Sequence, residues 1–203
     1  MSYADFTLDS VRKLLGVTLK QTVLFDQAPP LEVPAWLREV LDRGRYFLLN
    51  EKSRSEFVVA PILLASRELS GNKFAIFSGQ RLDVDPKRGL VGECDFILAL
   101  APPLPVLQAP IAIVMEAKKG DIEAGLGQCA AQMIAAHQFK LDEGMSAVPI
   151  HGCVTTGEDW QFLRFEESTL WIDSRRYYIR DLAAILGILQ AIVATCPPGA
   201  AAA

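Results

Sequence analysis

Two apolar runs in the middle of the chain carry charged residues where β-strands are expected. The run GECDFILAL contains Asp95, and the run IAIVMEAKK contains Glu116 and Lys118. Residues two apart on a strand point to the same face, so Glu116 and Lys118 are expected side by side, about 6.6 Å apart along the strand. Leaving such charges unpaired among large apolar residues would cost several kcal/mol. We therefore expect a compensating group, and a divalent cation held by Asp95 and Glu116 is the natural candidate.

The length and composition of the chain are those of a globular protein. The 203 residues favour a single domain over 1–203, and an apolar content of 51% is enough to build a core. The formal net charge of −4 argues against a generally basic surface for nucleic acid. Any contact with phosphate groups must then come from a local patch or from a bound metal.

Cysteine and histidine usage disfavours a structural zinc site, because the four cysteines lie far apart without a C-x-x-C pair and the chain has two histidines. The apolar surroundings of the cysteines favour reduced core thiols in a cytoplasmic protein. The first residues lack the basic start and apolar run of a signal peptide. The apolar segment 182–196 is shorter than the roughly 20 residues that a membrane span needs. We expect a cytoplasmic protein without membrane contact, in which that segment packs on the core.

Hydrophobic periodicity and turn residues divide the chain into helices and strands. A helix is expected from Ser55, whose hydroxyl can cap it, to Gly71, with a kink or break at Pro61 because proline removes a hydrogen bond. Three strands follow, and the proline-rich link 102–110 is too short for a crossover helix, which favours antiparallel pairing. The expected elements, in chain order, are a helix over 7–16, a strand over 17–25, a helix over 34–44, the helix over 55–71, strands over 74–82, 90–100 and 111–117, a helix over 120–140, three strands within 146–173, a helix from near Arg180, and a frayed tail over 197–203.

An acid on one strand, followed by Glu-x-Lys on the next, resembles the active-site signature of the PD-(D/E)XK nuclease superfamily, although the proline that opens the family's motif is missing. The order helix, three strands, helix, strand over about 55–154 resembles its core fold. Four blocks together resemble a bacterial branch of this superfamily: EKSRSEFVVAPIL, FSGQRLDVDPKRGLVGECDF, EAKKGDIEAGLGQCAAQM and HGCVTTGEDWQFL. The resemblance implies a restriction-endonuclease-like α/β fold. Its αβββαβ core would hold a mixed sheet flanked by helices, with N-terminal helices and a strand and a C-terminal hairpin and helix added.

The same resemblance implies how the charged strand residues act. Asp95 and Glu116 would ligate a metal, with the backbone carbonyl of Ala117 as a further ligand, and Mg²⁺ or Mn²⁺ suits such oxygen donors. Lys118 would orient or help deprotonate the attacking water, or stabilise negative charge on the phosphoryl oxygens. The implied activity is hydrolysis of phosphodiester bonds in nucleic acid by a metal-activated water, with DNA favoured over RNA.

Two further candidates lie on the expected helices. Glu56 matches the acidic residue that many members place on the first core helix, where it reaches the metal through water or supports a second ion. An acidic residue in a first helical turn is also what the helix dipole favours, so both interpretations stay open. Gln128 matches a polar residue often found on the helix after the lysine strand. Gln132, one turn further on, is more simply explained as a polar position on an alanine-rich helix.

Three other interpretations of the chain stay open. Glu116 and Lys118 alone could be a solvated ion pair on a half-exposed strand, and it is Asp95 in a second apolar strand that favours the metal. A nucleic-acid-binding or regulatory module could keep the fold without catalysis, which the acidic net charge supports. A scaffold protein could form a homodimer through the apolar run 182–193.

Four basic residues could form a local rim for a phosphate backbone or be scattered surface charges: Lys52, Arg54, Arg88 and Lys119.

Overall fold

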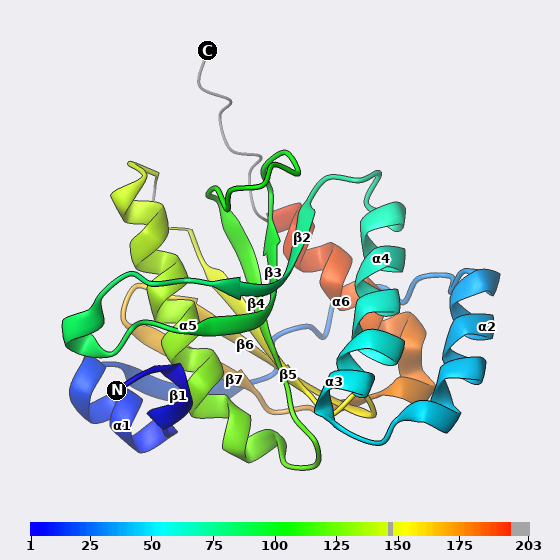
Figure 1. Ribbon diagram of the computed structural model, residues 1–203, viewed down its shortest axis with the longest axis horizontal. Coiled ribbons are helices and arrows are strands. Elements are labelled where there is room, and N and C mark those ends of the chain that lie inside the picture. The colour runs from blue at the N-terminus through cyan, green and yellow to red at the C-terminus, as the bar shows by residue number, and fades with distance from the viewer. Residues whose placement is uncertain (146–147, 196–203) are drawn as a thin grey trace.

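The structure is a computed structural model and describes residues 1–145 and 148–195. Within these residues, eight strands form one open mixed sheet with helices on both faces (Figure 1). The strands are β1 (Thr18–Thr22), β2 (Ala75–Arg81), β3 (Glu93–Ala99), β4 (Ile111–Ala117), β5 (Ile150–Thr155), β6 (Asp159–Glu166), β7 (Thr169–Asp173) and β8 (Tyr177–Tyr178). The α-helices are α1 (Leu8–Leu15), α2 (Ala35–Gly44), α3 (Glu51–Arg54), α4 (Ala60–Leu69), α5 (Ile122–Asp142) and α6 (Leu182–Thr195).

The strands lie in the order β1-β7-β6-β5-β4-β3-β2, and β8 pairs with β6 off this path. Strands β2, β3 and β4 form the expected antiparallel meander, because their connections are too short to cross the sheet. Helix α5 then crosses over and places β5 parallel to β4, as a crossover helix does. The prediction of an α/β fold with a mixed sheet flanked by helices is confirmed.

Two hydrophobic clusters lie on the two faces of the sheet. Helices α1 and α5 cover one face, while α2, α4 and α6 cover the other (Figure 1). Trp160 and Phe162 are fully buried and belong to the second cluster. Cys94, Cys129 and Cys153 are buried free thiols, which agrees with the expectation of reduced core cysteines.

The helix expected from Ser55 begins earlier, at Glu51, so the predicted start was wrong. Asn50 is its N-cap: the Asn50 side chain accepts a hydrogen bond from the backbone N–H of Ser53 at 2.9 Å, and Ser53 Oγ accepts one from the Asn50 N–H at 3.0 Å. The expected disturbance at Pro61 takes the form of a π-helical turn over Ser55–Val59, directly before α4, and not of a break. The helical run from Glu51 to Leu69 is therefore continuous.

Helix α6 follows a short 3₁₀ turn (Ile179–Asp181) and packs on the sheet with α4. Most of its large apolar side chains are buried in the chain's own core, which accounts for the apolar run at 182–193. A homodimer through this helix stays a prediction. Across residues 1–145 and 148–195, no helix combines the length and the hydropathy needed to cross a bilayer. The expected tail over 197–203 lies outside the described residues.

Candidate metal centre

Three carboxylates from distant parts of the chain meet at one end of the sheet. Glu51 comes from α3, Asp95 from β3 and Glu116 from β4, and one oxygen of each lies within 4.8 Å of the others. Figure 1 shows α3, the end of β4 and the start of α5 at this end of the molecule. Glu116 is only 2% exposed, whereas Glu51 is exposed. The group therefore offers oxygen donors from the buried sheet edge out to the surface.

The local backbone explains why Asp95 and Glu116 lie together. Phe96 pairs with Met115 across β3 and β4, so Asp95 and Glu116 are the next residues on neighbouring strands. Asp95 Oδ2 accepts a hydrogen bond from the backbone N–H of Ala117 at 2.7 Å. This bond fixes the Asp95 carboxylate beside β4.

Lys118 and Gln132 hold the Glu116 carboxylate from both sides, and Gln128 in turn holds Lys118. Lys118 Nζ donates to Glu116 Oε1 at 2.7 Å and to Gln128 Oε1 at 3.0 Å. Gln132 Nε2 donates to the other oxygen, Glu116 Oε2, at 2.9 Å, and its side chain is fully buried. The interpretation of Gln132 as a merely polar helix position was wrong. Gln128 and Gln132 are four residues apart on α5 and so share one face, which is the sequence signal that could have identified the pair.

Gly125 has no side chain, which lets α5 pack closely on the sheet and leaves space for the aliphatic part of Lys118. A Cβ atom at Gly125 would lie 2.6 Å from Val154 Cγ1 and 3.1 Å from Lys118 Cγ, which is too close for any larger residue without a shift. Glycine at this position therefore lets α5 approach β4 and β5. That approach brings Gln128 within hydrogen-bonding distance of Lys118.

Two of the three carboxylates, Asp95 and Glu116, have a raised pKa, mainly because they are partly removed from water. Burial, followed by the charge of Asp95, raises the pKa of Glu116 to about 7. Burial also raises the pKa of Asp95, opposed by the Ala117 N–H and by Lys118. Burial lowers the pKa of Lys118, but the hydrogen bond and charge of Glu116, with the charges of Glu51 and Asp95, outweigh it and raise that pKa. Lys118 is therefore an ammonium at neutral pH.

The charge balance of this group fits a divalent cation. With all three carboxylates ionised, the group and the Lys118 ammonium together carry an excess of two negative charges. A divalent cation among the carboxylates would balance this excess and oppose the two effects that raise the pKa of Glu116, burial and the charge of Asp95. Carboxylate oxygens are hard ligands of the kind that Mg²⁺ and Mn²⁺ prefer. Asp95, Glu116 and Glu51 are thus the residues suited to hold such an ion.

Glu56 lies apart from the three carboxylates, and Ala117 lies beside Asp95. The Glu56 carboxylate lies outside the three-carboxylate group and is exposed, with Lys52 Nζ 3.9 Å away. Glu51 supplies the acidic side chain expected from the first core helix, because that helix starts one turn earlier than predicted. Ala117 contacts Asp95 through its backbone N–H. The role of its carbonyl as a metal ligand stays a prediction.

A cavity of about 720 Å³ lies beside the carboxylates. Glu51 and Asp95 line it on one side, and Leu64, Ile76 and Phe96 supply apolar lining. This volume is in the range of pockets that bind small molecules, roughly 300–1,000 Å³. A ligand seated in the cavity would therefore reach two of the three candidate metal ligands.

Comparison with known proteins adds no relative to this description. No protein-family model matches the chain, and no curated protein matches it. The functional argument therefore rests on the geometry of the three carboxylates, Lys118 and the two glutamines.

Glu51 and Glu56 can be separated by matched substitutions. Glu51→Gln is expected to weaken Mn²⁺ binding on the order of tenfold or more, because it removes a carboxylate from the group. Glu56→Gln is expected to leave Mn²⁺ binding nearly unchanged. Isothermal titration calorimetry with Mn²⁺ on both variants measures this difference. A larger loss in Glu56→Gln than in Glu51→Gln would show that the sequence-based assignment was right and that Glu51 is incidental.

Proposed function

We propose that the protein is a metal-dependent nuclease that hydrolyses phosphodiester bonds of nucleic acid, with DNA as the preferred substrate. The observation that carries the proposal is the convergence of Asp95 and Glu116 with Lys118, whose Nζ lies 2.7 Å from Glu116 Oε1. A second, half-buried carboxylate and two glutamines surround this ion pair, and groups with perturbed pKa values cluster at functional sites. The helix, three antiparallel strands, helix and parallel strand that carry these residues also support the resemblance to the PD-(D/E)XK core.

Each residue of the site has a role in this proposal. Asp95, Glu116 and Glu51 would hold Mg²⁺ or Mn²⁺, which when bound supplies a Lewis acid and lowers the pKa of water. Lys118 carries a positive charge held between Glu116 and Gln128, and it stabilises negative charge that develops on the phosphoryl group. Gln128 orients Lys118, and Gln132 fixes the second oxygen of Glu116.

The basic residues near the cavity support a limited contact with a phosphate backbone. Lys52 lines the cavity, and its side chain is 83% exposed. The Arg54 guanidinium makes a hydrogen bond within the protein: its Nη1 donates to the backbone carbonyl of Thr156 at 2.9 Å. Of the candidate rim residues, Lys52 therefore lines the cavity and Arg54 does not face it freely. The acidic net charge of −4 makes metal-mediated contact with phosphates the main attraction.

A cleavage assay tests the proposal against its alternative. Labelled double-stranded DNA, single-stranded DNA and RNA are incubated with the protein in Mg²⁺, in Mn²⁺ and in EDTA, together with the Asp95→Asn variant. Cleavage that requires the metal and is lost in Asp95→Asn is the expected result. If the wild type binds these nucleic acids and cleaves none of them in Mn²⁺, the chain is a non-catalytic nucleic-acid-binding module instead.

A further inference from the structure

A second cavity, of about 250 Å³, lies between the segment that follows β1, the strands β5 and β6, and helix α6. Phe25, Pro29 and Ile192 supply apolar walls, and His151 and Arg164 supply basic groups. The cavity shares none of its lining residues with the cavity beside the carboxylates. His151 lies four residues along β5 from Thr155, about 13 Å away on an extended strand. The Thr155 carbonyl accepts the Lys118 N–H, so the two sites lie at different places along the sheet.

His151 has an unused hydrogen-bonding atom beside this cavity. Its side chain is 5% exposed, and Nδ1 is buried with no hydrogen-bond partner in the described part of the chain. Burial, together with the charges of Arg164 and Lys140, lowers the pKa of His151 to about 3, so the ring is neutral at pH 7. A buried polar atom left without a partner costs about 1–3 kcal/mol. An unpartnered buried atom needs an explanation, and a ligand bound in the cavity that His151 lines supplies one.

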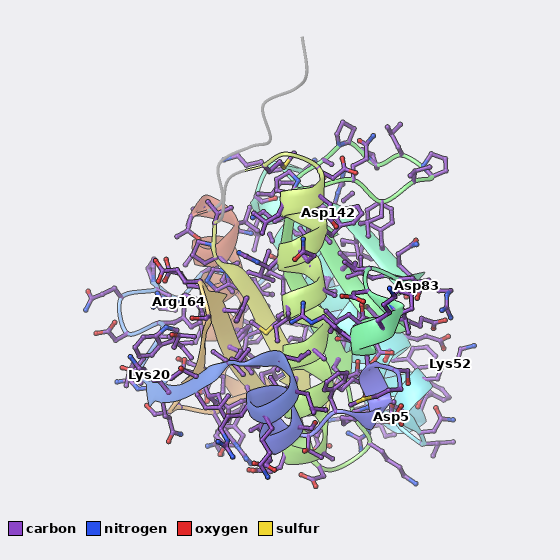
Figure 2. The ribbon with its side chains drawn as sticks, turned by 90° about the vertical axis from the view of Figure 1, so that its left-hand side faces the viewer. Asp5, Lys20, Lys52, Asp83, Asp142 and Arg164 are labelled. Atoms are coloured by element: carbon purple, nitrogen blue, oxygen red, sulfur yellow. The ribbon has the colours of Figure 1, made fainter. Side chains whose placement is uncertain are left out.

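Arg164 lies directly across from His151 in the pairing of β5 with β6. Its Nε is buried and also has no hydrogen-bond partner among residues 1–145 and 148–195. The nearest carboxylate oxygen, Glu166 Oε2, is 3.8 Å away, which is beyond hydrogen-bonding distance. The side chains of Arg164 and Glu166 are 36% and 47% exposed, so this ion pair is weak. The guanidinium therefore keeps donor capacity beside His151. Arg164 is labelled in Figure 2, on the part of the sheet below α6.

We propose that this cavity binds a small carboxylic acid with an apolar body. Guanidinium N–H groups favour a carboxylate, and a neutral imidazole adds one further hydrogen bond through Nδ1–H. The hydrocarbon part of the ligand packs against Phe25, whose ring centroid lies 6.0 Å from that of His151, and against Ile192.

The lining excludes other classes of ligand. A divalent cation would find one imidazole and the positive charge of Arg164, which repels it. A nucleotide is too large, since pockets for drug-sized ligands measure roughly 300–1,000 Å³ and this cavity measures about 250 Å³. Inorganic phosphate would satisfy Arg164 but leave the apolar walls unfilled. A short aliphatic or aromatic monocarboxylate satisfies the basic groups and the apolar walls together.

Ligand-observed NMR titration of the full chain with acetate, hexanoate, benzoate and the uncharged analogue benzamide tests the proposal. We expect hexanoate or benzoate to bind, and acetate and benzamide to bind at least about tenfold more weakly, which corresponds to one lost charge-assisted hydrogen bond or the lost apolar contact. Failure of both larger acids to bind, or equal binding of benzamide and benzoate, overturns the proposal.

Variants locate the binding and separate it from the metal centre. Arg164→Gln and His151→Leu are expected to weaken benzoate binding at least about tenfold. Arg43→Gln, which changes a 77% exposed arginine on α2, and Asp95→Asn are expected to leave benzoate binding unchanged. Arg164→Gln changes a partly exposed residue, and its melting curve establishes that it folds. Unchanged binding in Arg164→Gln, or lost binding in Asp95→Asn, contradicts the proposal whatever the outcome of the nuclease assay.

Discussion

Lys118→Ala is expected to lower the rate of DNA cleavage at least about 100-fold, while Mn²⁺ still binds. Removing one preorganised group that stabilises transition-state charge typically costs about 10²–10³ in rate. The carboxylates that would hold the metal remain in Lys118→Ala, and loss of a neighbouring positive charge does not weaken their attraction for a cation. Single-turnover cleavage assays and calorimetric Mn²⁺ titration measure the two effects separately.

Lys119→Ala is the matched control for this experiment. Lys119 is the next residue along the chain, is exposed, and has the same charge, so its removal tests for a general loss of attraction to nucleic acid. Cleavage by Lys119→Ala is expected to stay close to that of the wild type. A Lys118→Ala enzyme that cleaves as fast as the wild type would remove Lys118 from the proposed chemistry.

Glu116→Gln is expected to abolish metal binding and, at the same time, to stabilise the metal-free protein above neutral pH relative to the wild type. The pKa of Glu116 is raised to about 7 in the folded chain, from an ordinary value of 4.5. Between these values the folded state binds more protons than the unfolded state, so the free energy of unfolding falls as pH rises. The shift corresponds to a loss on the order of 3 kcal/mol between about pH 5 and pH 8. A glutamine side chain at this position does not titrate, so the free energy of unfolding of the variant does not fall with pH for this reason.

Urea unfolding in EDTA at pH 5, 6, 7 and 8 measures this effect as the difference between wild type and Glu116→Gln. The titratable groups around Glu116 are Asp95, Glu51, Lys118, Cys94 and Cys129, and all of them are present in both proteins. Saturating Mn²⁺ should restore stability to the wild type alone, by about 2.7 kcal/mol at a concentration 100 times Kd. A difference in the free energy of unfolding that does not change with pH, or equal stabilisation of both proteins by Mn²⁺, would contradict this explanation.

Sequence reasoning found the strand residues of the site because charge inside an apolar strand is costly and therefore informative. Asp95, Glu116 and Lys118 stood out for that reason, and the short link before Ile111 predicted the antiparallel pairing that brings the first two together. Gln128 was a candidate through the resemblance, and its Oε1 accepts a hydrogen bond from Lys118. These relationships join residues that are close in sequence or lie on consecutive strands, so a sequence pattern can predict them.

The residues that sequence reasoning missed depend on longer-range or less regular structure. Glu51 was missed because Asn50 was not recognised as the N-cap and because the π-helical turn over Ser55–Val59 disturbs the helical period. Gln132 was underrated, since a glutamine on a helix is usually exposed and only the packing of α5 on the sheet buries it. The parallel pairing of β1 with β7 joins strands about 150 residues apart, and no local pattern predicts such a contact.

The most direct test of the central claim is anomalous diffraction from crystals grown with Mn²⁺. We expect one strong anomalous peak coordinated by carboxylate oxygens of both Asp95 and Glu116, with Glu51 bound directly or through water. Absence of a peak at saturating Mn²⁺, or a peak held by other residues while Asp95 and Glu116 keep only their bonds to Ala117, Lys118 and Gln132, would contradict it.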